Sequence, residues 1–114
     1  MIAAAIEVHR ILGPRLLEGA YEESLAEELR LLGIGFQRQV ALEATYKCVR
    51  LQSQYRADLV IEDRLVVEVK AVERLLPVHH AQLLSYMKQS EKSVGLLLNF
   101  NVPSLREGIG SRVL

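Results

Sequence analysis

The most informative part of the chain runs from Arg56 to Ala71 and reads RADLVIEDRLVVEVKA. Apolar side chains fill its odd-numbered positions, whereas every charged side chain except Asp63 stands at an even-numbered one. Because side chains alternate between the two faces of a strand, this pattern predicts a pair of strands with one apolar face and one charged face.

The two strands can share their apolar face only if the turn between them has an odd length, because directly opposed residues lie on the same face. A turn over residues 62–64 meets this condition and pairs Ile61 with Leu65. The same register places Asp58 opposite Glu68, with Cβ atoms about 4.5–5.5 Å apart. Lys70 follows on the same face. The sequence therefore predicts a cluster of two carboxylates and one ammonium group.

Two carboxylates that face each other need positive charge between them, and two interpretations supply it. In the first, Arg56 and Lys70 balance the acids on a solvated face of the hairpin. In the second, Mg²⁺ or Mn²⁺ binds Asp58, Glu68 and the backbone carbonyl of Val69, because these hard cations prefer oxygen ligands and keep several waters. Lys70 can then orient or help to deprotonate a bound water, or balance charge that develops on a phosphate.

The remaining segments place this hairpin in an α/β fold. Apolar periodicity indicates helices over residues 2–12, about 15–32 and 78–91. An extended segment is expected over 36–46 and strands over 55–61, 65–71 and 93–100, whereas residues 101–114 show no clear period. The predicted order is helix-helix-strand-strand-strand-helix-strand, which is typical of a mixed central sheet flanked by helices.

Composition limits the class of protein. The 114 residues predict one domain over residues 1–114, and half of them are hydrophobic and a quarter charged, as in soluble globular proteins. No apolar run approaches the ~18 residues that span a bilayer, so no membrane contact is expected. The single cysteine, Cys48, cannot form an internal disulfide, which favours a cytoplasmic location. Because the formal net charge is zero, contact with a polyanion requires a local basic strip, for which the candidates are Arg38, Lys47, Arg50 and Arg56.

Motifs spread over nearly the whole chain carry a resemblance to a known family. An Asp followed about ten residues later by Glu-x-Lys on the next strand looks like the PD-(D/E)XK nuclease signature. The other matching residues are Leu12-Gly13-Pro14, Leu17-Glu18, Tyr21-Glu22, Gln39, Tyr46, Arg56-Ala57-Asp58, His80-Ala81-Gln82, Ser85-Tyr86 and the run from Gly95 to Phe100. Together they resemble the small bacterial family named for its GxxExxY motif, which is placed in the PD-(D/E)XK superfamily.

This resemblance implies a restriction-endonuclease-like core and assigns roles to the acidic cluster. Asp58 and Glu68 correspond to metal ligands and Lys70 to the catalytic lysine. Glu18 corresponds to the Glu of the family's name motif, and in the superfamily such a first-helix acid often reaches the metal, directly or through water. The resemblance therefore adds Glu18 to the catalytic residues and to the candidate metal ligands.

Three more residues enter the candidate site through the same resemblance. Gln82 and Tyr86, four residues apart, match the Q-x-x-x-Y helix that borders some of these active sites, and Gln82 is counted among the catalytic residues. Tyr21 lies three residues after Glu18 on a neighbouring part of the same helix face. For both tyrosines, the alternative is a core aromatic whose hydroxyl is hydrogen-bonded. Arg15 stands where the family has Gly, which changes the entrance to this helix.

The acidic cluster and the resemblance together predict a divalent-metal-dependent nuclease that hydrolyses phosphodiester bonds of nucleic acid, with DNA as the expected substrate. Specific interfaces with duplex DNA bury about 1,000–2,500 Å² of protein, so we expect a chain of this size to act as a homodimer. Two alternatives stay open. One is a non-catalytic nuclease-like module that binds nucleic acid or a protein partner. The other is a phosphohydrolase acting on nucleotides or another small phosphorylated substrate.

Overall fold

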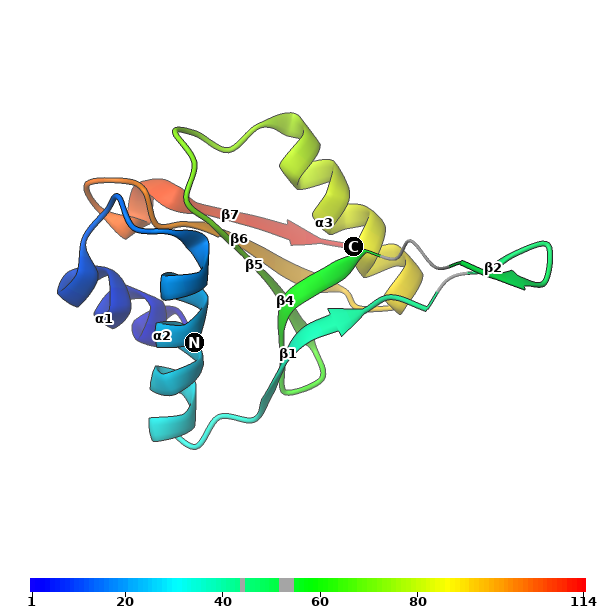
Figure 1. Cartoon of the computed structure of the whole chain (residues 1–114), viewed down its shortest axis with the longest axis horizontal. Helices are drawn as coiled ribbons and strands as arrows, with labels where there is room; N and C mark the ends of the chain where they lie inside the picture. Colours follow the sequence, from blue (N-terminus) through cyan, green and yellow to red (C-terminus); the bar gives the residue numbers. More distant parts are fainter. Residues whose placement is uncertain (44, 52–54) are drawn as a thin grey trace.

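The computed structural model describes residues 1–43, 45–51 and 55–114, which form a central sheet with helices on both faces (Figure 1). The helices are α1 (Ile2–Leu12), α2 (Glu18–Leu31) and α3 (Pro77–Ser90). The strands of the main sheet are β1 (Phe36–Ala41), β4 (Arg56–Ile61), β5 (Leu65–Lys70), β6 (Val94–Asn99) and β7 (Ile109–Val113). The predicted α/β class, with a mixed sheet flanked by helices, is confirmed. Within the described ranges, none of the helices combines the length and the apolar character that crossing a membrane requires.

The strands lie in the order β1-β4-β5-β6-β7. Only β5 and β6 pair in parallel, and α3 makes the crossover that a parallel pair requires. The other neighbouring strands are antiparallel. This topology places β4 and β5 inside the sheet, with a strand on each side of the pair that carries the acidic residues.

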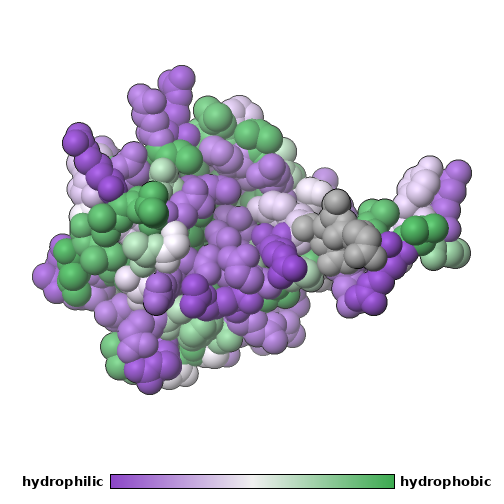
Figure 2. Space-filling model, viewed as in Figure 1, coloured by the Kyte–Doolittle hydropathy of each residue, from purple (hydrophilic) through white to green (hydrophobic). Residues whose placement is uncertain are grey.

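Two predicted boundaries are wrong for local reasons. The helix predicted over about 15–32 begins only at Glu18, because Arg15 has a positive φ of 76° and Leu17 is extended. The segment predicted over 36–46 is a continuous strand only as far as Ala41, and Ala44 lies outside the described residues. Beyond it, β2 (Thr45–Tyr46) and β3 (Val49–Arg50) form a separate small hairpin that projects from the body (Figures 1 and 2).

The segment 101–114, in which the sequence shows no clear period, contains a 3₁₀ helix (Leu105–Gly108) and strand β7. The apolar signal of β7 is weak because Gly110 stands where an inward-facing side chain would be expected. A Cβ atom at Gly110 would lie 2.9 Å from Cε1 of His80, so the imidazole ring of this α3 residue fills the space instead. A side chain of α3 therefore packs where β7 has only a glycine, and the sequence of β7 alone does not show this contact.

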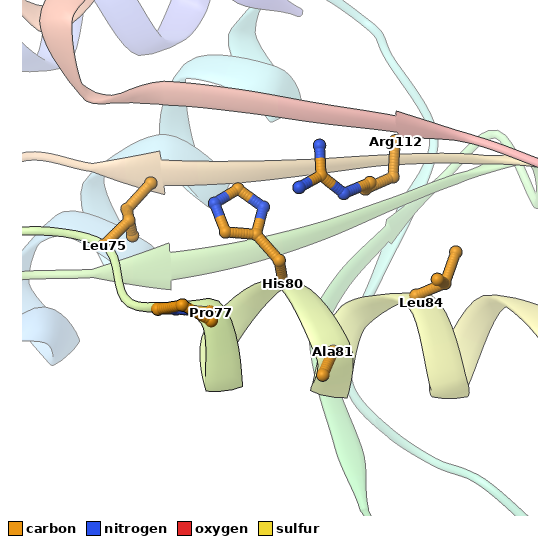
Figure 3. A pocket seen from close by; sticks show the side chains of 6 residues that line it. All are labelled: Leu75, Pro77, His80, Ala81, Leu84 and Arg112. Carbon is orange, nitrogen blue, oxygen red and sulfur yellow. The ribbon is translucent and has the colours of Figure 1, made fainter.

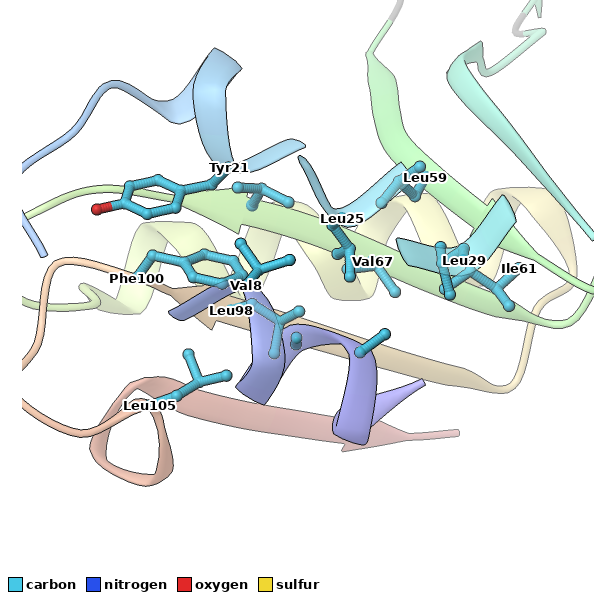
Figure 4. Close-up of a cluster of buried hydrophobic side chains, with 13 residues drawn as sticks. Val8, Tyr21, Leu25, Leu29, Leu59, Ile61, Val67, Leu98, Phe100 and Leu105 are labelled. Carbon is cyan, nitrogen blue, oxygen red and sulfur yellow. The ribbon is translucent and has the colours of Figure 1, made fainter. Parts of the chain in front are cut away.

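Two apolar cores lie on opposite faces of the sheet. On one face, α1 and α2 cover Leu59, Ile61 and Val67 of the hairpin (Figure 4). Val69 belongs to the same core, whereas Ala57 belongs to the core on the other face. Here the ring of Tyr21 stacks on that of Phe100, with centroids 4.6 Å apart. On the other face, α3 packs through Leu83, Tyr86 and Met87 on Val60, Val66 and Leu97. The face that α3 partly covers thus carries the even-numbered Val60 and Val66 of the hairpin.

We expect Leu25→Ala to lower the free energy of unfolding by about 2–5 kcal/mol, because Leu25 is fully buried and its truncation leaves a cavity. Leu31→Ala on the same helix is the control, since Leu31 is 63% exposed and should change stability by no more than ~0.5 kcal/mol. Urea denaturation measures both. Equal losses in the two variants would contradict the assigned core.

Candidate active site

The register of the central hairpin is the one predicted from the sequence. Ile61 pairs with Leu65 and Leu59 with Val67, so the turn spans residues 62–64. Glu62 and Asp63 adopt positive φ angles of 53° and 55°, which lets this short turn close. Where Leu59–Ile61 pairs with Leu65–Val67, the even-numbered side chains of both strands lie on one face, as expected.

Beyond the pair Leu59–Val67, the backbone ladder gives way to side-chain hydrogen bonds. The backbone N–H of Asp58 donates to Oε1 of Glu68 at 3.1 Å. In return, the N–H of Val69 donates to Oδ2 of Asp58 at 2.8 Å. Each carboxylate thus takes the place of a backbone carbonyl of its own strand, and the two acids are held against each other where the strands part.

Glu68 is the most buried acid of the site, with an exposed fraction of 3%. Burial, followed by repulsion from the Asp58 carboxylate, raises the pKa of Glu68 to about 7, although Tyr55, the Asp58 N–H and Lys70 favour the charged form. Burial and the nearby Glu68 in turn raise the pKa of the Tyr55 hydroxyl. Sequence reasoning missed Tyr55, which directly precedes β4. A carboxylate placed in this way is stabilised by any cation that comes between it and Asp58.

Lys70 ends β5 on the same face as Glu68 and is half-buried. Its ammonium group is close enough to lower the pKa of Glu68. Within the described parts of the chain, Lys70 forms no ion pair, and neither do Asp58 and Glu68. The first interpretation of the hairpin, in which Arg56 and Lys70 pair with the acids, is therefore not what the described residues show.

Helix α2 contributes an acid that the sequence analysis did not select. Glu22 is only 8% exposed, and its carboxylate accepts hydrogen bonds from Arg38 at 2.9 and 3.1 Å and from Nε2 of Gln39 at 2.8 Å. The same amide nitrogen donates to Oδ1 of Asp58 at 3.2 Å. The sequence signal that could have identified Glu22 is its place on the apolar stripe of α2, three residues before Leu25.

A family model described as the PD-(D/E)XK nuclease superfamily matches residues 1–112. The chain belongs to the PD-(D/E)XK nuclease superfamily. The superfamily predicted from the sequence is thereby confirmed, and the mixed sheet with its flanking helices is consistent with a restriction-endonuclease-like fold. No curated protein and no solved structure gives a significant match.

Nucleases of the PD-(D/E)XK superfamily generally use divalent metal ions, which need oxygen donors at the site. Mg²⁺ is commonly bound through one or two carboxylates and retains several waters. Asp58 and Glu68 supply two carboxylates, and the N–H of Val69 faces β4, the side to which its carbonyl also points in a regular strand. In the described ranges, no three His, Cys, Asp or Glu side chains are grouped so that they could hold a metal ion. The oxygen donors present fit a hard divalent cation that keeps part of its water.

The other residues that the PD-(D/E)XK resemblance selected are exposed, apart from the two tyrosines. Glu18 is exposed in the first turn of α2 and does not join Asp58 and Glu68 in a group of three acids. Gln82 is exposed on α3 and has no hydrogen-bond partner among the described residues. Arg56 is exposed at the start of β4.

The two tyrosines are buried and hydrogen-bonded. The hydroxyl of Tyr21 donates to the carbonyl of Gly13 at 2.6 Å and accepts from the N–H of Leu16 at 3.1 Å, so it fastens the connection between α1 and α2. The hydroxyl of Tyr86 donates to the carbonyl of Val40 at 3.1 Å. Burial and Glu68 raise the pKa of Tyr86, which places this ring in the electrostatic surroundings of the acidic pair.

A separate hollow of about 490 Å³ lies between α3 and β7 (Figure 3). Its lining residues are Leu75, Pro77, His80, Ala81, Leu84 and Arg112. Nδ1 of His80 is buried there without a hydrogen-bond partner in the described part of the chain. Burial, Arg112 and His79 lower the pKa of His80. None of the predicted active-site residues lines this hollow.

We expect Glu68→Gln to become increasingly more stable than the wild type as the pH rises from about 5 to about 8 in the presence of a chelator. The folded protein binds the Glu68 proton more tightly than the unfolded chain, because the pKa is raised from 4.5 to about 7. Ionisation of Glu68 therefore lowers the free energy of unfolding through this window, by on the order of 3 kcal/mol. The amide that replaces this carboxylate in the variant does not ionise.

Urea denaturation at pH 5 and pH 8 measures this difference, with the exposed Glu23→Gln on α2 as the control for removal of one carboxylate. If the difference between Glu68→Gln and the wild type were the same at both pH values, Glu68 would not be held as the structure shows.

Proposed function

We propose that this chain is a divalent-metal-dependent nuclease that hydrolyses phosphodiester bonds of DNA. The observation that supports the proposal best is the pair of the buried Glu68 and the partly buried Asp58, whose carboxylates are held together by backbone N–H groups. The two carboxylates repel each other, and a divalent cation bound between them would relieve this repulsion. Membership of the PD-(D/E)XK superfamily favours the same chemistry.

In this proposal, Asp58, Glu68 and the backbone carbonyl of Val69 hold Mg²⁺ or Mn²⁺. When bound, the cation supplies a Lewis acid for the scissile phosphate and lowers the pKa of a water molecule. Glu18, one turn before Glu22 on α2, stays a proposed additional ligand on the basis of the family resemblance alone.

Lys70 is the proposed catalytic lysine. Its ammonium group lies beside the acidic pair, is half-buried and is unpaired among the described residues, so its three N–H donors are available to a substrate or a water. A hydrogen bond from Lys70 can orient the attacking water and balance the charge that develops on the phosphate. Gln82 and Tyr86 are proposed to border the substrate on the α3 side.

The proposed substrate is DNA, and part of its contact surface is proposed on the β2–β3 hairpin. The base of this hairpin is fixed by a hydrogen bond of 2.9 Å from the N–H of Leu42 to the carbonyl of Tyr55, the residue beside Glu68. Lys47 on the hairpin and Arg56 at its base form no ion pair with a described residue. Exposed cations of this kind are suited to backbone phosphates.

A homodimer is part of the same proposal. The chain has a radius of gyration of 14.1 Å and an accessible surface of 7130 Å². An interface of roughly 1,000–2,500 Å² with duplex DNA would take a large share of that surface. Two copies related by a two-fold axis would divide this contact and present one site to each strand.

We expect Lys70→Ala to lower the rate of Mg²⁺- or Mn²⁺-dependent DNA cleavage by roughly 10²–10⁴-fold, as removal of a proton-transfer group does. Binding of Mn²⁺ and of DNA should persist, because the carboxylates and the other cations remain. Lys88→Ala, at an exposed position near the end of α3, is the matched control and should cleave like the wild type.

The cleavage assay uses a labelled oligonucleotide, with free nucleotides as a second substrate class. A wild-type protein that binds DNA but shows no metal-dependent cleavage would favour the non-catalytic module. Hydrolysis of free nucleotides in preference to oligonucleotides would favour the small-molecule phosphohydrolase.

A further inference from the structure

One residue of β1 departs from strand geometry directly beside the acidic pair. In the pairing of β1 with β4, Arg38 lies opposite Leu59 and Val40 opposite Ala57, so the register brings Gln39 opposite Asp58. Gln39 itself has a φ of 51°, in the left-handed region that residues other than glycine seldom adopt. Backbone strain of this kind is found preferentially at functional sites.

The side-chain amide of Gln39 joins two carboxylates. Its Nε2 atom donates to Oε1 of Glu22 at 2.8 Å and to Oδ1 of Asp58 at 3.2 Å. Both partners are carboxylates, which accept hydrogen bonds when ionised, so the NH₂ end of the amide must face them. Because Arg38 fixes the other oxygen of Glu22 at 2.9 Å, the amide is anchored from α2 as well as from β1.

Gln39 completes the fixation of Asp58. The N–H of Val69 already holds Oδ2 of Asp58 at 2.8 Å, and Gln39 holds Oδ1, so neither oxygen can turn freely. The amide carries no charge, unlike a lysine or arginine at the same place. It therefore orients Asp58 without cancelling the negative charge that attracts a divalent cation.

We propose that Gln39 is a positioning residue that acts through Asp58 and orients its carboxylate for a divalent cation. This inference rests on the proposed function, because it assigns Asp58 to a metal site. It explains why a strained residue stands in the row formed by Gln39, Asp58 and Glu68 on three neighbouring strands. Groups that orient a metal ligand typically contribute about 10–100-fold to metal affinity or activity.

The test compares Gln39→Met with Gln37→Met. Methionine has nearly the size of glutamine and no N–H donor, and Gln37 is an exposed glutamine on the same strand. We expect Gln39→Met to weaken Mn²⁺ binding by about 10-fold or more, as measured by the electron paramagnetic resonance of free Mn²⁺. On DNA, kcat should fall by a similar factor while KM stays unchanged, and Gln37→Met should match the wild type in each measurement.

Gln39→Asn is a second variant that separates a loss of Mn²⁺ binding from a failure to fold. Asparagine tolerates a positive φ better than most residues, but its shorter side chain cannot span from Glu22 to Asp58, so the same loss of Mn²⁺ affinity is expected. Unchanged or tighter Mn²⁺ binding in Gln39→Met and Gln39→Asn, with a wild type that binds Mn²⁺, would overturn the role of Gln39 alone. A wild-type protein that binds no Mn²⁺ would overturn the proposed function together with this inference.

Discussion

The candidate site depends on the exchange of two hydrogen bonds between β4 and β5, in which each strand's backbone N–H reaches a carboxylate from the other strand. The N–H of Asp58 binds Glu68, and the N–H of Val69 binds Asp58. This exchange lets two acids lie side by side inside a sheet, because it satisfies backbone groups that the parting strands would leave without partners. It also keeps the carboxylates from turning toward solvent. The remaining elements serve to hold this one place in the sheet.

The surrounding sheet and helices disfavour the charged form of Glu68. Because β1 and β6 flank the hairpin and α3 covers part of its even-numbered face, Glu68 is removed from water and its charge is disfavoured. On the other face, the stacked rings of Tyr21 and Phe100 fix α2 against the sheet, and α2 carries Glu22. The packed core thereby positions the Glu22–Gln39 contact that reaches Asp58 from the edge of the sheet.

Alternation along residues 56–71 was sufficient to predict the register of Leu59–Ile61 against Leu65–Val67 and the turn at 62–64. It was sufficient because a shift of one residue would have buried every charge of the hairpin. Glu22, Gln39 and Tyr55 could not be found in this way, since their contacts join segments that are distant in sequence and depend on how α2 and β1 pack. Strand β7 was missed because Gly110 leaves its inward position to the ring of His80. Local periodicity predicts faces, whereas partners on other elements follow from packing.

The central claim is that Asp58 and Glu68 share a divalent cation. The most direct measurement is a crystal structure of the wild-type protein grown or soaked with Mn²⁺, with anomalous diffraction used to locate the ion. We expect an anomalous peak between the two carboxylates, with Mn–O distances of roughly 2.0–2.3 Å, close to those of Mg²⁺. Crystals that contain millimolar Mn²⁺ but show no peak there, with Asp58 and Glu68 hydrogen-bonded as in the metal-free protein, would contradict it.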